Sequence, residues 1–171
     1  MSGKLKDLAR TGLYRTAVSG IIATLPMSLW MVAAQRLMPS GNRAPLPPEQ
    51  ITGRVLLRLG LPGTAHSSGW RRSLSLVSHF AYGALSGTLY LPLETLPLSP
   101  AQRGTLLGLF IWALNYLKVL PELSLYPAAQ KQSFQRNLTM VTAHLIWGGA
   151  LGLVNNGLLS GVRRRDSQLR G

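Results

Sequence analysis

The sequence predicts an all-α fold, an integral membrane four-helix bundle built as two tandem helical hairpins. Three observations support this prediction. The chain contains four long apolar runs, its cations lie mostly beside these runs, and one short motif occurs twice. Hydrophobic residues make up 46% of the 171 residues and charged residues only 13%. An average soluble domain has roughly 25% charged residues.

The net charge of +13 would suit a nucleic-acid-binding protein, but the positions of the cations argue against that class. No apolar run has a cationic face that could follow a phosphate backbone. The cations instead flank the runs, which is typical of membrane spans. We therefore expect the lipid bilayer, and no nucleic acid, as the partner. The flanking cations include Lys4, Lys6, Arg10, Arg15, Arg71, Arg72, Arg163, Arg164 and Arg165.

The first half of the chain is expected to begin with a basic tail at residues 1–15 and a first span at 16–37. About 20 apolar residues are needed to cross a hydrocarbon core. The loop 38–72 follows and contains a short amphipathic helix at about 49–59, since prolines precede this segment and Gly60 ends it. Its apolar stripe and its two arginines fit equally well with binding to anionic lipid headgroups and with packing on the rim of the protein.

The second half is expected to supply most of the remaining transmembrane domain. Ser99 can cap the third span, because its side chain can accept a backbone N–H and Pro100 suits the first helical position. A basic C-terminal tail is expected over residues 161–171. The transmembrane domain as a whole covers residues 16–160, and its last three spans are expected at 73–93, 102–120 and 138–159.

The repeated motif has the form His-x-x-[Tyr/Trp]-Gly-x-x-x-Gly. Its histidine and two glycines are four residues apart and therefore share one face of a helix. Two crossings separate the copies, so both helices run in the same direction. We expect two equivalent helices that meet along a seam of these residues, which are His79, Tyr82, Gly83 and Gly87 in the first copy and His144, Trp147, Gly148 and Gly152 in the second.

Glycines at four-residue spacing have a specific use in a membrane. Lipid tails give no hydrophobic reward for helix association, so close packing of the backbones must supply it. Gly104 and Gly108 form another such pair in the third span. These two glycines and Gly20 could also form a seam with a second copy of the chain, in a homo-oligomer, or with another membrane protein.

Two interpretations are open for His79 and His144. A histidine that faces lipid is costly, so both are expected to face inward and to form hydrogen bonds within the bundle. Two histidines at a matched depth could also bind a b-type haem, and the protein would then be an electron-transfer protein. Structural hydrogen bonding is the favoured interpretation, because glycine pairs favour helix contact over an enclosed macrocycle.

No catalytic constellation is visible in the sequence. The five acidic residues are scattered and the chain has no cysteine, which leaves no carboxylate pair, metal cage or thiolate. The span centres are nearly all apolar, and this counts against a third alternative, a small-solute transporter or channel. We therefore expect a non-enzymatic protein with a structural or interaction role in the membrane, without a metal or a cofactor.

Polar residues at the span ends have simple interpretations. Asn115, Lys118 and Glu122 could form an ion pair or a proton path, but a Lys118 side chain that extends to the interface is the simpler explanation. On the opposite side of the membrane, Glu94, Asn155 and Asn156 are expected to be interfacial caps.

One group of residues resembles the YagU-type inner-membrane proteins, a class of small multi-pass bacterial proteins of unknown function. The resemblance covers about residues 73–155. It implies a location in the bacterial inner membrane and no particular reaction. The residues that carry it are Gly104, Gly108, Trp112, Tyr116, the segment Leu120-Pro121-Glu122-Leu123, and the second copy of the repeated motif.

The orientation of the chain depends on its termini. Four spans would place both termini on one side of the membrane. The cations divide evenly between the two sides, so the positive-inside rule alone does not decide. Because Arg163, Arg164 and Arg165 directly follow the last span, we expect cytoplasmic termini.

Overall fold

The computed structural model describes residues 2–38 and 45–168, and every regular element in this part of the chain is helical. The prediction of an all-α fold is therefore confirmed. The elements are α1 (Ser2–Leu37), α2 (Pro47–Arg58), α3 (Pro62–His66), α4 (Ser68–Thr88), η2 (Leu91–Thr95), α5 (Pro100–Ala113), η3 (Leu114–Val119), α6 (Leu120–Glu122), η4 (Ala129–Lys131) and α7 (Phe134–Gln168).

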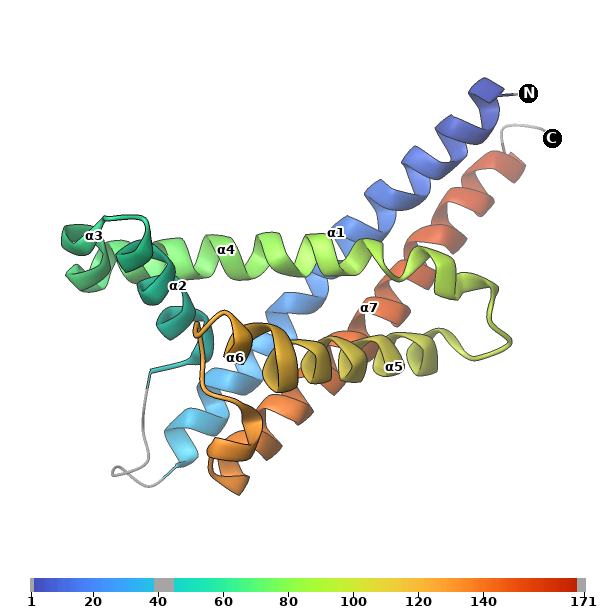
Figure 1. Cartoon of the computed structure of the whole chain (residues 1–171). Coiled ribbons are helices and arrows are strands. Elements are labelled where there is room, and N and C mark those ends of the chain that lie inside the picture. Colours follow the sequence, from blue (N-terminus) through green and yellow to red (C-terminus); the bar gives the residue numbers. More distant parts are fainter. Residues whose placement is uncertain (1, 39–44, 169–171) are drawn as a thin grey trace.

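Helices α1 and α7 form the centre of the molecule. They pack against each other along much of their length, while α4 packs on α1 and α5 packs on α7 (Figure 1). The short helix α2 covers the first half of α4 at the far end from the termini. The start of α1 and the end of α7 point to the same end of the molecule (Figure 1).

Three helical segments in the described part of the chain are long and apolar enough to cross a membrane, Ala9–Leu37, Pro100–Glu122 and Phe134–Gly161. They indicate a multi-pass membrane protein. The fourth expected span, residues 73–93, is not among them. Helix α4 forms at this place but ends at Thr88, and its five serines and two arginines lower its mean hydropathy.

The two expected tails extend the terminal helices. Helix α1 begins at Ser2 and α7 continues to Gln168, so residues 2–15 and 161–168 are helical. Neither segment contains proline, and their Lys, Arg and Leu residues favour a helix. The last residues of the expected C-terminal tail, 169–171, lie outside the described residues.

The expected amphipathic helix at about 49–59 corresponds to α2, which packs on the protein itself. Glu49 accepts hydrogen bonds from Nε and Nη2 of Arg71 at 3.1 and 3.0 Å, and Thr52 lies 3.3 Å from the Ser78 hydroxyl of α4. These contacts fix α2 across α4. Packing on the rim is thus the observed role of this helix, and contact with lipid headgroups stays a prediction.

Helix α5 begins as the sequence predicts. Ser99 Oγ accepts the backbone N–H of Gln102 at 3.3 Å, and Gln102 Oε1 accepts the backbone N–H of Ser99 at 2.9 Å. This reciprocal pair satisfies two donors at the helix start. The same helical segment widens into the π-helical turn η3 before Pro121, which has no N–H to continue the hydrogen-bond ladder.

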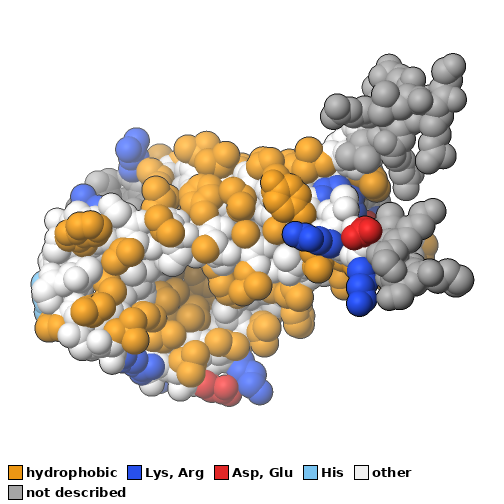
Figure 2. Space-filling model, turned by 90° about the horizontal axis from the view of Figure 1, so that it is seen from above, with side chains coloured by type: hydrophobic (Ala, Val, Ile, Leu, Met, Phe, Trp, Pro, Cys, Tyr) orange, Lys and Arg blue, Asp and Glu red, His pale blue; other side chains and the backbone are white. Residues whose placement is uncertain are grey.

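Much of the outer surface is apolar. Leu29 of α1, Leu85 of α4, Phe110 of α5 and Leu153 of α7 are all more than half exposed. Figure 2 shows hydrophobic side chains across most of one face, with charged groups toward its ends and lower edge. A surface of this kind suits lipid contact better than water.

Candidate functional site

The first glycine contact joins α1 and α4. A Cβ atom on Gly20 would collide with the carbonyl oxygen of Gly83, and a Cβ atom on Gly87 would lie 2.5 Å from the carbonyl oxygen of Thr16. Real Cβ atoms essentially never come closer than 3.0 Å to such an atom. Only glycine therefore permits this separation of the two backbones.

The second glycine contact joins α5 and α7 in the same manner. A Cβ atom on Gly104 would collide with the Gly148 carbonyl oxygen, and one on Gly108 with the carbonyl oxygen of His144. On the other helix, Gly148 faces the Gly104 carbonyl and Gly152 faces the carbonyl of Pro100. The contact is therefore close from both sides.

These contacts change the interpretation of the repeated motif. The two copies lie on α4 and α7, and their glycines face α1 and α5 rather than each other. Lipid-facing seams at Gly20 or at Gly104 and Gly108 are unavailable in this structure, because these glycines are already covered within the chain.

Three helices meet at Gly20, although this residue lies outside the repeated motif. Its Cα lies against α4, and its carbonyl oxygen accepts hydrogen bonds from Thr24 Oγ1 at 2.8 Å and from Trp147 Nε1 of α7 at 3.2 Å. Trp147 is 3% exposed. The indole nitrogen thus binds a carbonyl that the absent side chain leaves accessible.

Tyr82, the counterpart of Trp147, lies in a different environment. The residue is 44% exposed, and its hydroxyl oxygen accepts a hydrogen bond from Asn115 Nδ2 of η3 at 2.7 Å. Lys118 and Glu122, which the sequence groups with Asn115, are exposed. Asn115 therefore links α4 to the π-helical turn and is not part of an ion pair with them.

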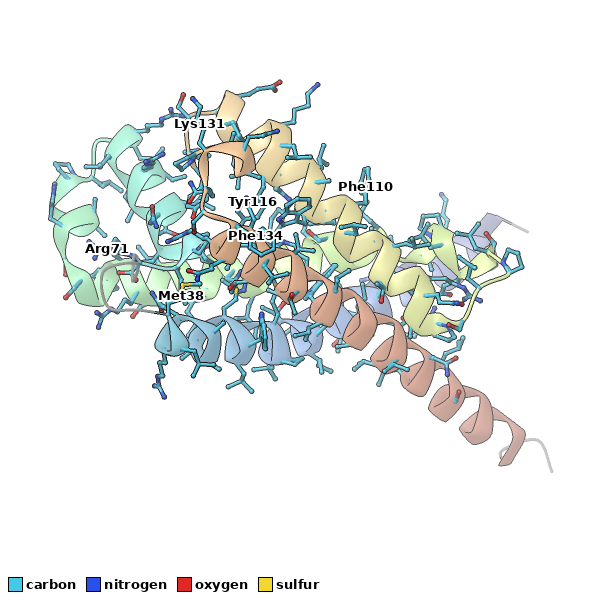
Figure 3. All side chains as sticks on the ribbon, turned by 90° about the horizontal axis from the view of Figure 1, so that it is seen from below. Met38, Arg71, Phe110, Tyr116, Lys131 and Phe134 are labelled. Carbon is cyan, nitrogen blue, oxygen red and sulfur yellow. The ribbon has the colours of Figure 1, made fainter. Side chains whose placement is uncertain are left out.

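His144 is buried, and its hydrogen bond stays within its own helix. Nδ1 lies 2.8 Å from the carbonyl oxygen of Met140, which identifies this nitrogen as the donor. The imidazole meets the ring of Tyr116 edge to face, with the centroids 5.8 Å apart. Figure 3 shows Tyr116 directed from its helix toward the interior. The contacts are those of a structural histidine.

His79 has a different environment from its counterpart. Its Nε2 atom is buried and has no hydrogen-bond partner in the described part of the chain. The side chain lines a cavity of about 220 Å³ and an adjoining one of about 170 Å³, and His144 lines neither. The two histidines therefore do not share these cavities, and each volume is below the roughly 300–1,000 Å³ of usual ligand pockets.

A polar cluster at the other end of the bundle is absent from the sequence-based prediction. Arg15 Nη2 of α1 lies 2.9 Å from Glu94 Oε2, and Asn155 Nδ2 of α7 donates to Glu94 Oε1 at 2.7 Å. The Arg15 and Glu94 side chains are only 11% and 21% exposed. Glu94 and Asn155 are thus not independent caps, because together they join α1, η2 and α7.

No other chemical constellation emerges from the part of the chain that the structure describes. Residues 2–38 and 45–168 contain no group of three or more His, Cys, Asp or Glu side chains placed to hold a metal ion. Comparison with known proteins adds no function, since no family model, no curated protein and no solved structure matches the chain. The resemblance to the YagU-type proteins stays a prediction.

The glycine contacts predict the effect of Gly148→Ala. The added methyl group would collide with the backbone of α5, so we expect a loss of about 1–3 kcal/mol in the free energy of unfolding. Unfolding in mixed detergent micelles would measure this change. Gly157→Ala on the same helix is the control, because nothing lies within 4 Å of its Cβ position. Equal stability of the two variants would contradict the close contact.

The polar cluster predicts the effect of Glu94→Gln. This change removes the charge that balances Arg15 but keeps one acceptor for Asn155. We expect a loss of about 1–3 kcal/mol, between the values for exposed and buried ion pairs, because both side chains are partly accessible. The same unfolding measurement applies. Glu122→Gln, at an exposed acid outside the cluster, should leave stability unchanged, and a similar loss there would contradict the prediction.

Proposed function

We propose that the protein is a non-enzymatic membrane protein with a structural or interaction role, built from two helical hairpins that cross the membrane four times. The observation that carries this proposal is the backbone contact at the glycines of both helix pairs. Such packing needs no hydrophobic driving force and is therefore suited to a lipid solvent.

The tandem arrangement is supported by equivalent contacts in the two helix pairs. Gly87 meets the Thr16 carbonyl in the first pair, as Gly152 meets the Pro100 carbonyl in the second. One turn further along, Gly83 and Gly148 each face the carbonyl of a glycine, Gly20 and Gly104 respectively. The same register in both pairs is expected if one hairpin was duplicated.

A fourth crossing through α4 is compatible with the low mean hydropathy of that helix. Its serines at positions 75 and 86 are buried, whereas Leu76, Val77 and Leu85 are 58%, 67% and 67% exposed. Ser75 and Ser86 thus lie against the rest of the protein, and these three apolar side chains are available for contact with lipid, whereas Ser68, Ser73 and Ser78 are exposed. Mean hydropathy along the sequence does not register this distribution.

The proposed location is the bacterial inner membrane with cytoplasmic termini. The resemblance to the YagU-type proteins supports the membrane, and the three arginines at positions 163–165 support the orientation. The apolar outer surface is available for lipid and for lateral contact with a second copy or another membrane protein. Anionic headgroups are the expected partners of the flanking cations.

The absence of native cysteine allows a direct test of the four crossings. We expect Leu85→Cys on α4 to resist a membrane-impermeant maleimide in intact membranes and to react after detergent is added, because the bilayer would cover it. Leu59→Cys, at an exposed position after α2, is the control that should react from one side without detergent. Labelling of Leu85→Cys in intact membranes would contradict a crossing through α4 and leave three crossings.

The alternative of a bis-histidine haem protein is tested by an absorption spectrum of the purified protein in detergent. We expect no Soret band, because the cavities that His79 lines are small and are not shared with His144. A Soret band that disappears in both His79→Ala and His144→Ala would contradict the proposed structural role and support a role in electron transfer.

A further inference from the structure

Two adjoining cavities lie beneath α2, between α1, α4 and η3. The larger has a volume of about 220 Å³ and the smaller about 170 Å³. They share His79, Met31 and Pro48 as wall residues. Protein interiors are normally close-packed. Neither the glycine contacts nor the proposed structural role requires such a space.

The walls present hydrogen-bonding atoms that the protein leaves unused. His79 Nε2 and Ser28 Oγ are buried and lack a partner among residues 2–38 and 45–168. A buried polar atom without a partner costs about 1–3 kcal/mol. Ser28 lines only the smaller cavity, whereas His79 lines both, so a molecule bound in the larger cavity could complete the hydrogen bonding of His79.

Tyr82 defines the kind of group that can bind. Its hydroxyl oxygen already accepts a hydrogen bond from Asn115, which leaves its O–H group free to donate to a ligand. A neutral imidazole can likewise donate through Nε2. A carbonyl oxygen, which only accepts, is complementary to these donors.

The other wall residues define the rest of the ligand. None of the residues that line the larger cavity is acidic, lysine or arginine, and these residues include Met27, Met31, Ile51 and Leu120. An uncharged, mainly apolar molecule is therefore favoured. Thioethers make favourable contacts with aromatic rings, and an apolar cavity of about 150 Å³ holds benzene. The larger cavity thus suits one substituted ring.

The elements around the cavities hold this space open. The π-helical turn η3 carries both Asn115 and Tyr116 into the wall, and π-helical turns often occur at functional sites. Helix α2 forms the cover, held by Glu49 and Arg71. Figure 3 shows Arg71 on the side of α4 that is next to α2.

We propose that the larger of these cavities forms a binding site for an uncharged aromatic carbonyl compound with a single ring. The carbonyl oxygen accepts hydrogen bonds from His79 and Tyr82, and the ring lies between Met27 and Met31. This site is independent of the structural role proposed above and would give the protein a ligand-dependent function.

The test uses the full chain in lipid nanodiscs with ¹³C-methyl methionine, and acetophenone as the probe. We expect saturable shifts of the Met27 and Met31 methyl signals that exceed any shift of Met140, which lines neither cavity but contacts the wall residue Tyr116. The isosteric hydrocarbon α-methylstyrene lacks the carbonyl oxygen and should bind at least about fivefold more weakly. Shifts that grow linearly for all methionines, or equal affinities for the two probes, would overturn the proposal.

Variants assign the hydrogen bonds to particular residues. His79→Phe and Tyr82→Phe keep a ring and should each reduce the preference for acetophenone over α-methylstyrene at least threefold. His66→Phe is the matched control, because His66 is exposed and bonds only its own helix at Pro62. A preference that survives in both cavity variants would overturn the assignment. The comparison of the two probes on the unaltered chain remains decisive if a variant does not fold.

Discussion

At Gly104 and Gly148 two helix backbones lie so close that neither position could carry a Cβ atom. This closeness sets the geometry of the whole bundle. In water, helices associate because apolar surface is removed from solvent, whereas lipid tails offer no such reward, so close packing and hydrogen bonds between helices must supply it. The chain meets this constraint twice, at α1 with α4 and at α5 with α7, and the two long helices α1 and α7 then pack on each other.

Close packing also exposes carbonyl groups that side chains would otherwise cover. Trp147 uses one of them at Gly20 and thereby connects α7 to the contact between α1 and α4. Toward the end of the bundle where α1 begins and α7 ends, the carboxylate of Glu94 connects Arg15 with Asn155. Apolar packing in the middle and a polar cluster near one end thus hold the same helices, and each type of contact occurs where the surroundings permit it.

The two copies of the repeated motif show how one pattern acquires two roles. In the second copy, His144 lies among Met140 and Tyr116, and its nitrogen bonds a carbonyl of its own helix. In the first copy, His79 borders cavities under α2, and its Nε2 has no partner in the described residues. The elements that surround the two positions cause this divergence, since α2 covers the space beside His79, whereas Tyr116 of the π-helical turn packs directly on His144.

The sequence by itself determined the helical class, three of the apolar spans, the amphipathic α2 and the capped start of α5. These features depend on composition, periodicity and residues close along the chain. Only the tertiary structure decided what the glycines face, that Glu94 pairs with Arg15, and that His79 borders a cavity. The physical reason is sequence distance. A glycine shows that a close approach is allowed, but the partner, which here lies 36 to 71 residues away, depends on how all helices pack together.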